Sequence, residues 1–144
     1  NMNISLDIYG DGSQFEYLQK LIVDKNLENI ISLNGIVKNI IDHSDDYNFL
    51  ILTSFHEGHP NVIFEAMKNY LFVISTDVGD VKNLIRTNTG IIIDGFSKND
   101  IATALHSYIV IPYNQKLNII KEAKKIVEQK TNLNSIVKSW VEII

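Results

Sequence analysis

Two carboxylates, Glu57 and Glu65, flank a stretch of sequence that reads as the start of a helix. Pro60 stands between them where a first helical residue would lie, because its φ is already set and it has no N–H to lose. The next three residues would leave their backbone N–H groups unpaired, and such a helix end binds phosphate or carboxylate through these donors and the macrodipole. These residues are Asn61, Val62 and Ile63.

The two carboxylates suit a ligand that carries hydroxyl groups beside a phosphate. A carboxylate directly at a phosphate would repel it, but one placed a few ångströms aside can accept hydrogen bonds from sugar hydroxyls. A helix end with two lateral carboxylates therefore fits a diphosphate between two polyols, and a nucleotide sugar is such a molecule. The plainer interpretation is that both are surface charges, and the spacing alone favours it because helix surfaces carry many carboxylates.

Alternating apolar runs and helical periodicities predict the elements that position these residues. The run Phe49–Thr53 before Glu57 is typical of a strand buried in a parallel sheet. Other strands are predicted at Ile4–Tyr9, Ile30–Leu33, Phe72–Ser75 and Gly90–Asp94. Helices are predicted at Ser13–Lys25 with a capping box of Ser13 and Glu16, at Val37–His43, at Val81–Ile85, at Asn99–Tyr108 capped by Ser97, at Asn114–Lys130 with Leu117, Ile120, Ala123, Ile126 and Val127 inward, and at Asn134–Ile144.

This alternation implies an α/β fold with a doubly wound parallel sheet and right-handed crossovers. Ligands of such sheets bind outside the carboxyl ends of the strands. The loops Thr53–Asn61 and Thr76–Asp80 both follow strands, so we expect them at this same edge, forming one site.

Composition excludes several classes of function. The 144 residues suffice for one domain with a hydrophobic core. The net charge is −4 and no cluster of basic residues is present, so the composition does not favour binding to nucleic acid. Without cysteine there is no disulfide, thiolate nucleophile or cysteine zinc site, and the four histidines lack ligand spacing. No apolar run approaches the roughly 18 residues of a membrane helix, and no signal-peptide pattern is present. Asp45 and Asp46 precede a strand, which favours a solvated turn over a metal or phospho-acceptor pair.

The string E-G-H-P-N-V-I-F-E-A-M at 57–67, followed by V-I-S-T-D-V-G at 73–79, resembles the donor-binding half of retaining glycosyltransferases of family 4, which have the GT-B fold. Three further segments match in the expected order, so the resemblance covers nearly the whole chain. They are Leu6–Gly12, Ile31–Val37 and Thr89–Asp94.

The resemblance implies a Rossmann-like parallel sheet of about five strands with helices on both faces, the GT-B C-terminal subdomain. Residues 1–144 would form the donor-binding domain of an enzyme that transfers a hexose from a UDP- or GDP-sugar. Glu65 would hold the ribose hydroxyls, and Glu57 would be the catalytic residue facing the transferred sugar. The donor-binding segment between them would be Gly58, His59, Pro60, Asn61 and Val62, and a base or phosphate loop would be formed by Gly35, Ile36, Val37, Lys38, Val78 and Gly79. For Gly35–Lys38, the sequence alone favours a plain connection between a strand and a helix. The resemblance implies no metal and no cofactor besides the donor.

Three residues depart from the family pattern. Tyr70 and Asp80 stand where glycine is usual, and Phe72 stands where proline is usual. A left-handed conformation at the end of the helix would cost Tyr70 about 1 kcal/mol or more. Asp80 works against phosphate unless its side chain caps the following helix.

The family's first strand–helix unit, with an Arg and a Lys that hold the diphosphate, and its N-terminal acceptor domain have no counterpart in 1–144. That strand normally lies between the counterparts of Ile4–Tyr9 and Phe49–Thr53. We expect these two strands to pair directly, giving the order 2-1-3-4-5; the alternatives are that another chain supplies a strand or that the sheet is left defective. The chain by itself is expected to be inactive. Its expected partners are a nucleotide sugar and the missing acceptor domain, and no nucleic-acid partner is expected. The expected location is the cytoplasm or, for a full-length enzyme, the inner face of the membrane. Membrane association and homo-oligomerisation are left open.

The alternative from another class is a non-catalytic nucleotide-binding or interaction module derived from this fold. Tyr70, Phe72 and Asp80 favour it, whereas the intact Glu57 and Glu65 oppose it. A flavodoxin-like or receiver domain is disfavoured because its acidic pocket or phosphate loop is absent.

Overall fold

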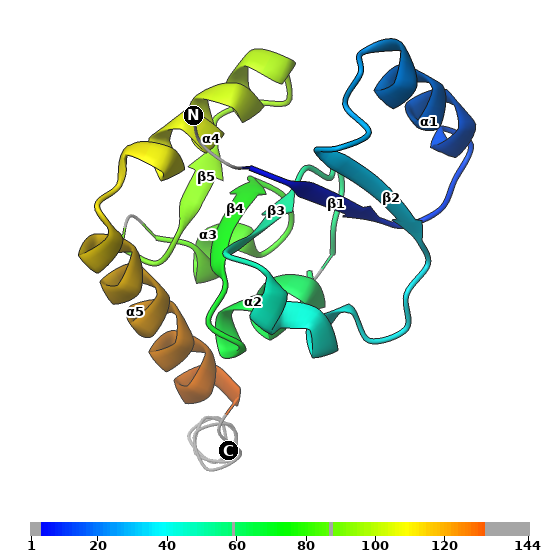
Figure 1. Cartoon of the computed structure of the whole chain (residues 1–144). Coiled ribbons are helices and arrows are strands. Elements are labelled where there is room, and N and C mark those ends of the chain that lie inside the picture. The colour runs from blue at the N-terminus through cyan, green and yellow to red at the C-terminus, as the bar shows by residue number, and fades with distance from the viewer. Residues whose placement is uncertain (1–3, 59, 87, 132–144) are drawn as a thin grey trace. The chain divides into compact units, whose positions relative to one another are not determined.

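The computed structural model describes residues 4–58, 60–86 and 88–131 (Figure 1). The chain folds as two compact units, Asn1–Asp42 and His43–Ile144. The predicted last helix, Asn134–Ile144, lies outside the described residues. No helix in the described part of the chain is long and apolar enough to cross a membrane.

The first unit is a β-α-β element. Strands β1 (Leu6–Tyr9) and β2 (Ile31–Gly35) pair in parallel, and helix α1 (Phe15–Asp24) connects them. The predicted capping box of Ser13 and Glu16 is wrong, because α1 begins at Phe15 with Gln14 as its N-cap and no side-chain cap. A backbone turn starts the helix instead, with the Phe15 amide donating to the Gly12 carbonyl at 3.0 Å.

The second unit carries the remaining elements around a parallel sheet. A 3-10 helix, η1 (Ile40–Asp46), leads into it, so the predicted helix at 37–43 begins later and is of another type. The elements that follow are β3 (Phe49–Leu52), α2 (Asn61–Lys68), β4 (Phe72–Thr76), α3 (Val81–Leu84), β5 (Ile91–Ile93), α4 (Lys98–Val110) and α5 (Tyr113–Thr131). Strands β3, β4 and β5 run side by side, with β4 in the middle and all five of its residues buried (Figure 1).

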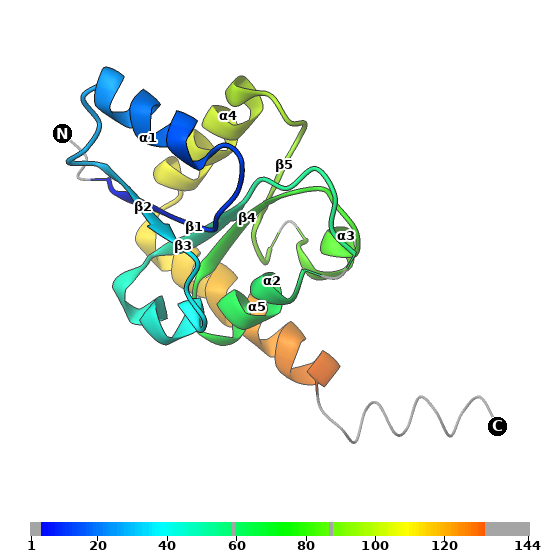
Figure 2. The same ribbon diagram turned by 90° about the vertical axis from the view of Figure 1, so that its right-hand side faces the viewer.

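Side chains of β4 alternate between two cores, as the two-residue period of a strand requires. Val73 packs with buried residues of α2, α3 and α5 on one face of the sheet. Phe72 and Ile74 point to the other face, where α4 lies (Figure 2). The first core includes Ile63, Ala66, Met67, Val81, Leu84, Ala123 and Val127, and the second includes Ile93, Ala104 and Ile119.

Phe72, at the position where the resemblance expects proline, has an evident packing role. It is 1% exposed, and its ring meets that of Tyr108 on α4 at 4.9 Å with an interplanar angle of 61°. Burial raises the pKa of Tyr108 above its usual value. An aromatic at this position therefore joins β4 to α4 through a ring pair that proline would not form.

The inward face of α5 is a narrower stripe than predicted. Ala123 and Val127 are buried as expected, and Ile119, one turn earlier, completes the stripe. Leu117, Ile120 and Ile126 are only half-buried. The spacing of i, i+4 and i+8 places the three buried residues in one line along the helix.

The expected direct pairing of the first and third strands would join the two units, and it stays a prediction. The described strands form two sheets, with β1 paired to β2 and β3 paired to β4. The α/β class with parallel strands is confirmed within each unit, and the order 2-1-3-4-5 across the two units stays a prediction.

Candidate functional site

The start of α2 differs by one residue from the prediction. Pro60 is the N-cap, with φ −75° and ψ 85°, and the helix begins at Asn61. The Ile63 amide donates to the Pro60 carbonyl at 3.0 Å, so it is not free to bind a ligand. The amides of Asn61 and Val62 precede the first hydrogen bond of the helix and lack a carbonyl within it. The helix thus presents two amides at its start rather than the expected three.

A serine and a threonine that the sequence analysis did not single out hold Glu57 in place. Thr76, fully buried at the end of β4, donates its Oγ1 hydrogen to the Ser54 carbonyl at 2.7 Å. The Ser54 hydroxyl in turn donates to Glu57 Oε1 at 2.8 Å, and Glu57 is half-buried. A threonine ending an apolar strand and a serine three residues before a carboxylate were the signals available in the sequence.

Gly79 brings the two predicted loops together. Its φ is +52°, and a Cβ at this position would overlap the carbonyl oxygens of Glu57 and Gly58. Val78 beside it is buried. The expectation that Thr53–Asn61 and Thr76–Asp80 meet at one edge of the sheet is therefore confirmed, and only glycine satisfies both the space and the backbone conformation.

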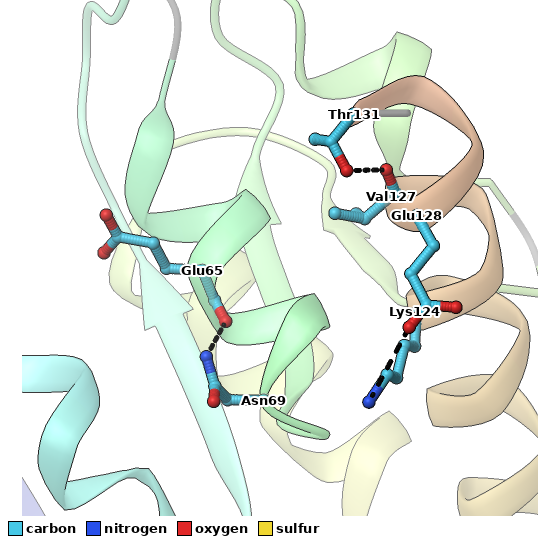
Figure 3. A network of polar contacts seen from close by, with 6 residues as sticks. All are labelled: Glu65, Asn69, Lys124, Val127, Glu128 and Thr131. Atoms are coloured by element: carbon cyan, nitrogen blue, oxygen red, sulfur yellow. Dashed lines mark hydrogen bonds and ion pairs between the residues drawn. The ribbon is translucent and has the colours of Figure 1, made fainter. Parts of the chain in front are cut away.

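Glu65 lies on the exposed side of α2. Its carboxylate points away from α5, whose Lys124 and Glu128 are visible at the other side of the helix (Figure 3). The Glu65 backbone carbonyl accepts hydrogen bonds from the Asn69 side chain at 2.9 Å and from the Asn69 amide at 3.1 Å. Asn69 therefore closes the last turn of α2 while the carboxylate remains exposed.

A groove of about 790 Å³ runs beside α2. Asn61 and Glu65 line it from α2, and Asp80 lies at the start of α3. Its cations are Arg86 and Lys130. It also contains Phe64, Asn83, Leu84 and Thr131. Mixed charges make this groove suitable for a polar ligand that carries both hydrogen-bond donors and acceptors.

Asp80 was expected to work against phosphate unless its side chain caps the following helix, and this cap is not formed. It occupies the N-cap position of α3 but makes no side-chain cap hydrogen bond there. Its Oδ1 accepts from Asn83 Nδ2 at 3.3 Å. Next to it, Lys82 and Asp77 form an ion pair. Because α3 has only four residues, its dipole adds little to any anion binding.

The other predicted site residues fall into two groups. Gly35, with φ +64°, ends β2, and Ile36, Val37 and Lys38 follow it in the first unit. Glu57–Glu65 and Val78–Gly79 belong to the second unit. His59 lies outside the described residues. Within the described ranges, no three His, Cys, Asp or Glu side chains gather in a way that could hold a metal ion.

The chain matches known proteins over most of its length. The sequence model of the family described as Glycosyl transferases group 1 matches residues 1–109. The poly(ribitol-phosphate) alpha-N-acetylglucosaminyltransferase of Staphylococcus aureus is 26% identical over 97% of this chain and 29% of its own length. The GtfA subunit of the UDP-N-acetylglucosamine–peptide N-acetylglucosaminyltransferase of Streptococcus agalactiae is 30% identical over 78% of this chain and 23% of its own length.

The fold is shared with solved structures. HepE of Anabaena, in complex with UDP-glucose, superimposes with a TM-score of 0.81 at 21% identity, over 96% of this chain and 40% of HepE. The chain thus spans less than a third of the length of the two curated relatives. The chain belongs to the group 1 glycosyltransferases and has the fold of the C-terminal half of their GT-B structure.

Proposed function

We propose that this chain is the donor-binding part of a retaining glycosyltransferase that takes a hexose from a UDP- or GDP-sugar. The observation that carries the proposal is the junction at Gly79, where the loop bearing Glu57 meets the loop after β4 beside the start of α2. The crystal structure of HepE with UDP-glucose supports a UDP-sugar as the donor, as does the name of the Streptococcus agalactiae relative.

Each group in the site binds the part of the donor that suits its chemistry. The amides of Asn61 and Val62, at the positive end of α2, bind phosphate oxygen. Glu65 accepts hydrogen bonds from the ribose hydroxyls. Glu57 accepts from a hydroxyl of the transferred sugar, since a carboxylate that accepts one bond from Ser54 keeps further lone pairs for others.

The diphosphate leaving group needs electrostatic stabilisation as negative charge develops on it. The two amides of α2 contribute part of this, and no metal is required. The remaining cations and the acceptor domain belong to a longer protein or to a partner chain, because this chain covers 40% of HepE and less of the curated relatives. The isolated chain binds the donor but does not transfer the sugar.

Titration of the chain with UDP, GDP and their glucose conjugates, followed by amide NMR, tests the proposal. UDP or GDP should shift the amides of Asn61, Val62 and Gly79. Glu65→Ala should weaken nucleotide binding at least tenfold, because the ribose hydroxyls lose their acceptor. Glu122→Ala, an exposed carboxylate on α5, is the matched control and should leave binding unchanged. Equal affinities of the Glu65→Ala variant and the parent chain would contradict the assigned role.

A non-catalytic module derived from this fold is the second candidate. One observation favours it: the carboxylate of Asp80 lines the same groove as Asn61 at the start of α2, and the Asp80 side chain does not cap α3. The same titration separates the proposed function from a module that serves only for interaction, because such a module shows no shift with millimolar UDP or GDP while its amide spectrum remains that of a folded protein.

A further inference from the structure

Two exposed phenylalanines meet at the carboxyl edge of the second unit's sheet. Phe55 follows β3 by three residues, and Phe96 follows β5 by three residues. Their ring centroids lie 5.1 Å apart with an interplanar angle of 23°, yet their side chains are 68% and 46% exposed. Since β4 separates β3 from β5, the two strands are about 10 Å apart, and their loops must converge over the end of β4 to bring the rings together.

The backbone beside Phe55 is held by a buried hydrogen bond. The preceding carbonyl, that of Ser54, accepts from Thr76 Oγ1 at 2.7 Å. This bond anchors the loop to the end of β4, so the backbone that carries the Phe55 ring is held in place.

The backbone around Phe96 is held from both sides. Gly95 has φ +122°, and its amide donates to the Ile93 carbonyl at 3.0 Å. Ser97 caps α4 in a capping box, in which Asp100 Oδ2 accepts from the Ser97 amide at 2.8 Å and Ser97 Oγ accepts from the Asp100 amide at 3.2 Å. An apolar surface fixed in this way is preorganised for a ligand.

The loops that carry the rings also carry carboxylates. Glu57, half-buried and oriented by Ser54, follows Phe55 by two residues, and exposed Asp94 precedes Phe96 by two residues. A pyranose ring has an apolar C–H face and a rim of hydroxyl donors, which match an aromatic face with carboxylate acceptors beside it. Apolar surface rimmed by polar residues is typical of a binding site.

We propose that Phe55 and Phe96 form a stacking platform for a pyranose ring of the saccharide substrate. This inference rests on the proposed function. A protein partner fits less well, because the two rings offer only about 230 Å² of exposed surface if each full side chain has about 200 Å². A stable protein interface buries about 800 Å² on each partner. The platform accommodates either the transferred hexose of the donor or a sugar of the acceptor.

The test is an NMR titration of the full chain that observes the phenylalanine ring resonances with UDP, UDP-glucose and methyl glucoside. Methyl glucoside or UDP-glucose should shift the rings of Phe55 and Phe96, whereas UDP alone should shift only the α2 amides. Phe55→Ala and Phe96→Ala should each weaken saccharide binding roughly threefold to tenfold and leave UDP affinity unchanged. Phe55→Leu keeps apolar surface without the ring and should fall between. Tyr113→Ala, which removes a ring that is 73% exposed on α5, is the control and should change neither.

A second titration distinguishes whether the bound sugar comes from the donor or from the acceptor. If the platform takes the transferred hexose, UDP-glucose shifts the rings and prevents methyl glucoside from shifting them further. If it takes the acceptor sugar, methyl glucoside shifts the rings of chain already saturated with UDP-glucose.

Three outcomes overturn the platform. The first is the absence of ring shifts at about 100 mM saccharide while UDP still shifts the α2 amides, which leaves the proposed function standing. The second is a saccharide affinity that neither alanine variant changes. The third is ring shifts that depend on protein concentration without saccharide, which indicates that a second copy covers the pair. Failure of both UDP and GDP to shift the α2 amides contradicts the proposed function by a separate readout.

Discussion

Gly79 and Tyr70 share a left-handed backbone conformation at opposite edges of the same sheet, with φ +52° and +62°. At Gly79, near the carboxyl ends of the strands, the carbonyl oxygens of Glu57 and Gly58 occupy the space of a side chain. At Tyr70, after α2, the side chain is 57% exposed, and Lys124 Nζ lies 3.7 Å from its ring centroid. At Gly79 the surrounding atoms therefore exclude any side chain, whereas at Tyr70 the left-handed conformation only favours glycine.

The departure at Tyr70 consequently says little about the state of the site. It lies at the end of α2 opposite to the helix start, and the left-handed conformation predicted for it is confirmed. The cation–π contact with Lys124 offsets part of the strain, since such contacts contribute about 0.5–1 kcal/mol at exposed positions. An altered residue there is compatible with an intact arrangement of Glu57, Thr76 and Gly79.

The largest expected effect is that of Gly79→Ala. A Cβ would force the loop bearing Glu57 away, and the left-handed backbone adds its own strain, so β4 should lose at least about 2 kcal/mol of stability. Native-state amide exchange of β4 measures the loss, and UDP titration should show that binding disappears. Gly12→Ala, where a Cβ meets nothing within 4 Å, is the control and should cost little. A Gly79→Ala variant with normal exchange and UDP affinity would show that the two loops are not locked together.

Next in size is Thr76→Val, which keeps the branched shape but removes the hydroxyl. The Ser54 carbonyl would lose its 2.7 Å hydrogen bond, at a cost of about 1–3 kcal/mol. The amides of 54–58 should shift, and UDP-glucose affinity should fall more than UDP affinity because Glu57 loses its support. Thr76→Ser retains the donor and should behave like the parent chain. If valine and serine variants bind UDP-glucose equally, the hydroxyl does not position Glu57.

A pair of substitutions at Tyr70 measures the strain at the other edge. Tyr70→Ala and Tyr70→Gly both remove the contact with Lys124, but only glycine relieves the left-handed conformation. The glycine variant should therefore be more stable than the alanine variant by about 1 kcal/mol, measured by amide exchange of β4. Neither variant should alter UDP affinity. Equal stability of the two variants would show that the backbone at this position carries no strain.

The smallest effect concerns the cap of α4 beside Phe96. Hydrogen bonds from the Ser97 hydroxyl and amide hold the pKa of Asp100 below its usual value of 3.8. A carboxyl whose folded-state pKa is depressed adds stability above its unfolded pKa, and this contribution is lost as the pH falls through the folded-state value. The protection of α4 amides against exchange, relative to the unfolded chain at the same pH, should therefore decrease on acidification below about pH 4 in the parent chain. In the Asp100→Asn variant this pH dependence should be absent, and an identical pH profile would contradict it.

Most elements could be predicted from local sequence because their determinants are local. The run Phe49–Leu52, the helix after Pro60 and the cap at Ser97 all follow from residues within a few positions of one another. The predictions that failed also rested on residues close together in the sequence. Ser13 and Glu16 satisfy the spacing of a capping box, but the turn at Gly12–Phe15 starts the helix two residues after Ser13. The helix at Val37–His43 is a 3-10 helix that begins at Ile40.

By itself, the sequence determined the class of the fold and supplied the candidate residues of the site. The α/β alternation, the flanking carboxylates and the family membership are all readable from the order of residues. The tertiary structure alone decided which strands pair, that Thr76 supports Glu57 through Ser54, that Gly79 has no room for a side chain and that Phe55 meets Phe96. These contacts join residues about 20 to 40 positions apart, and no local propensity or spacing encodes them because they form only when parallel strands bring their carboxyl ends to one edge.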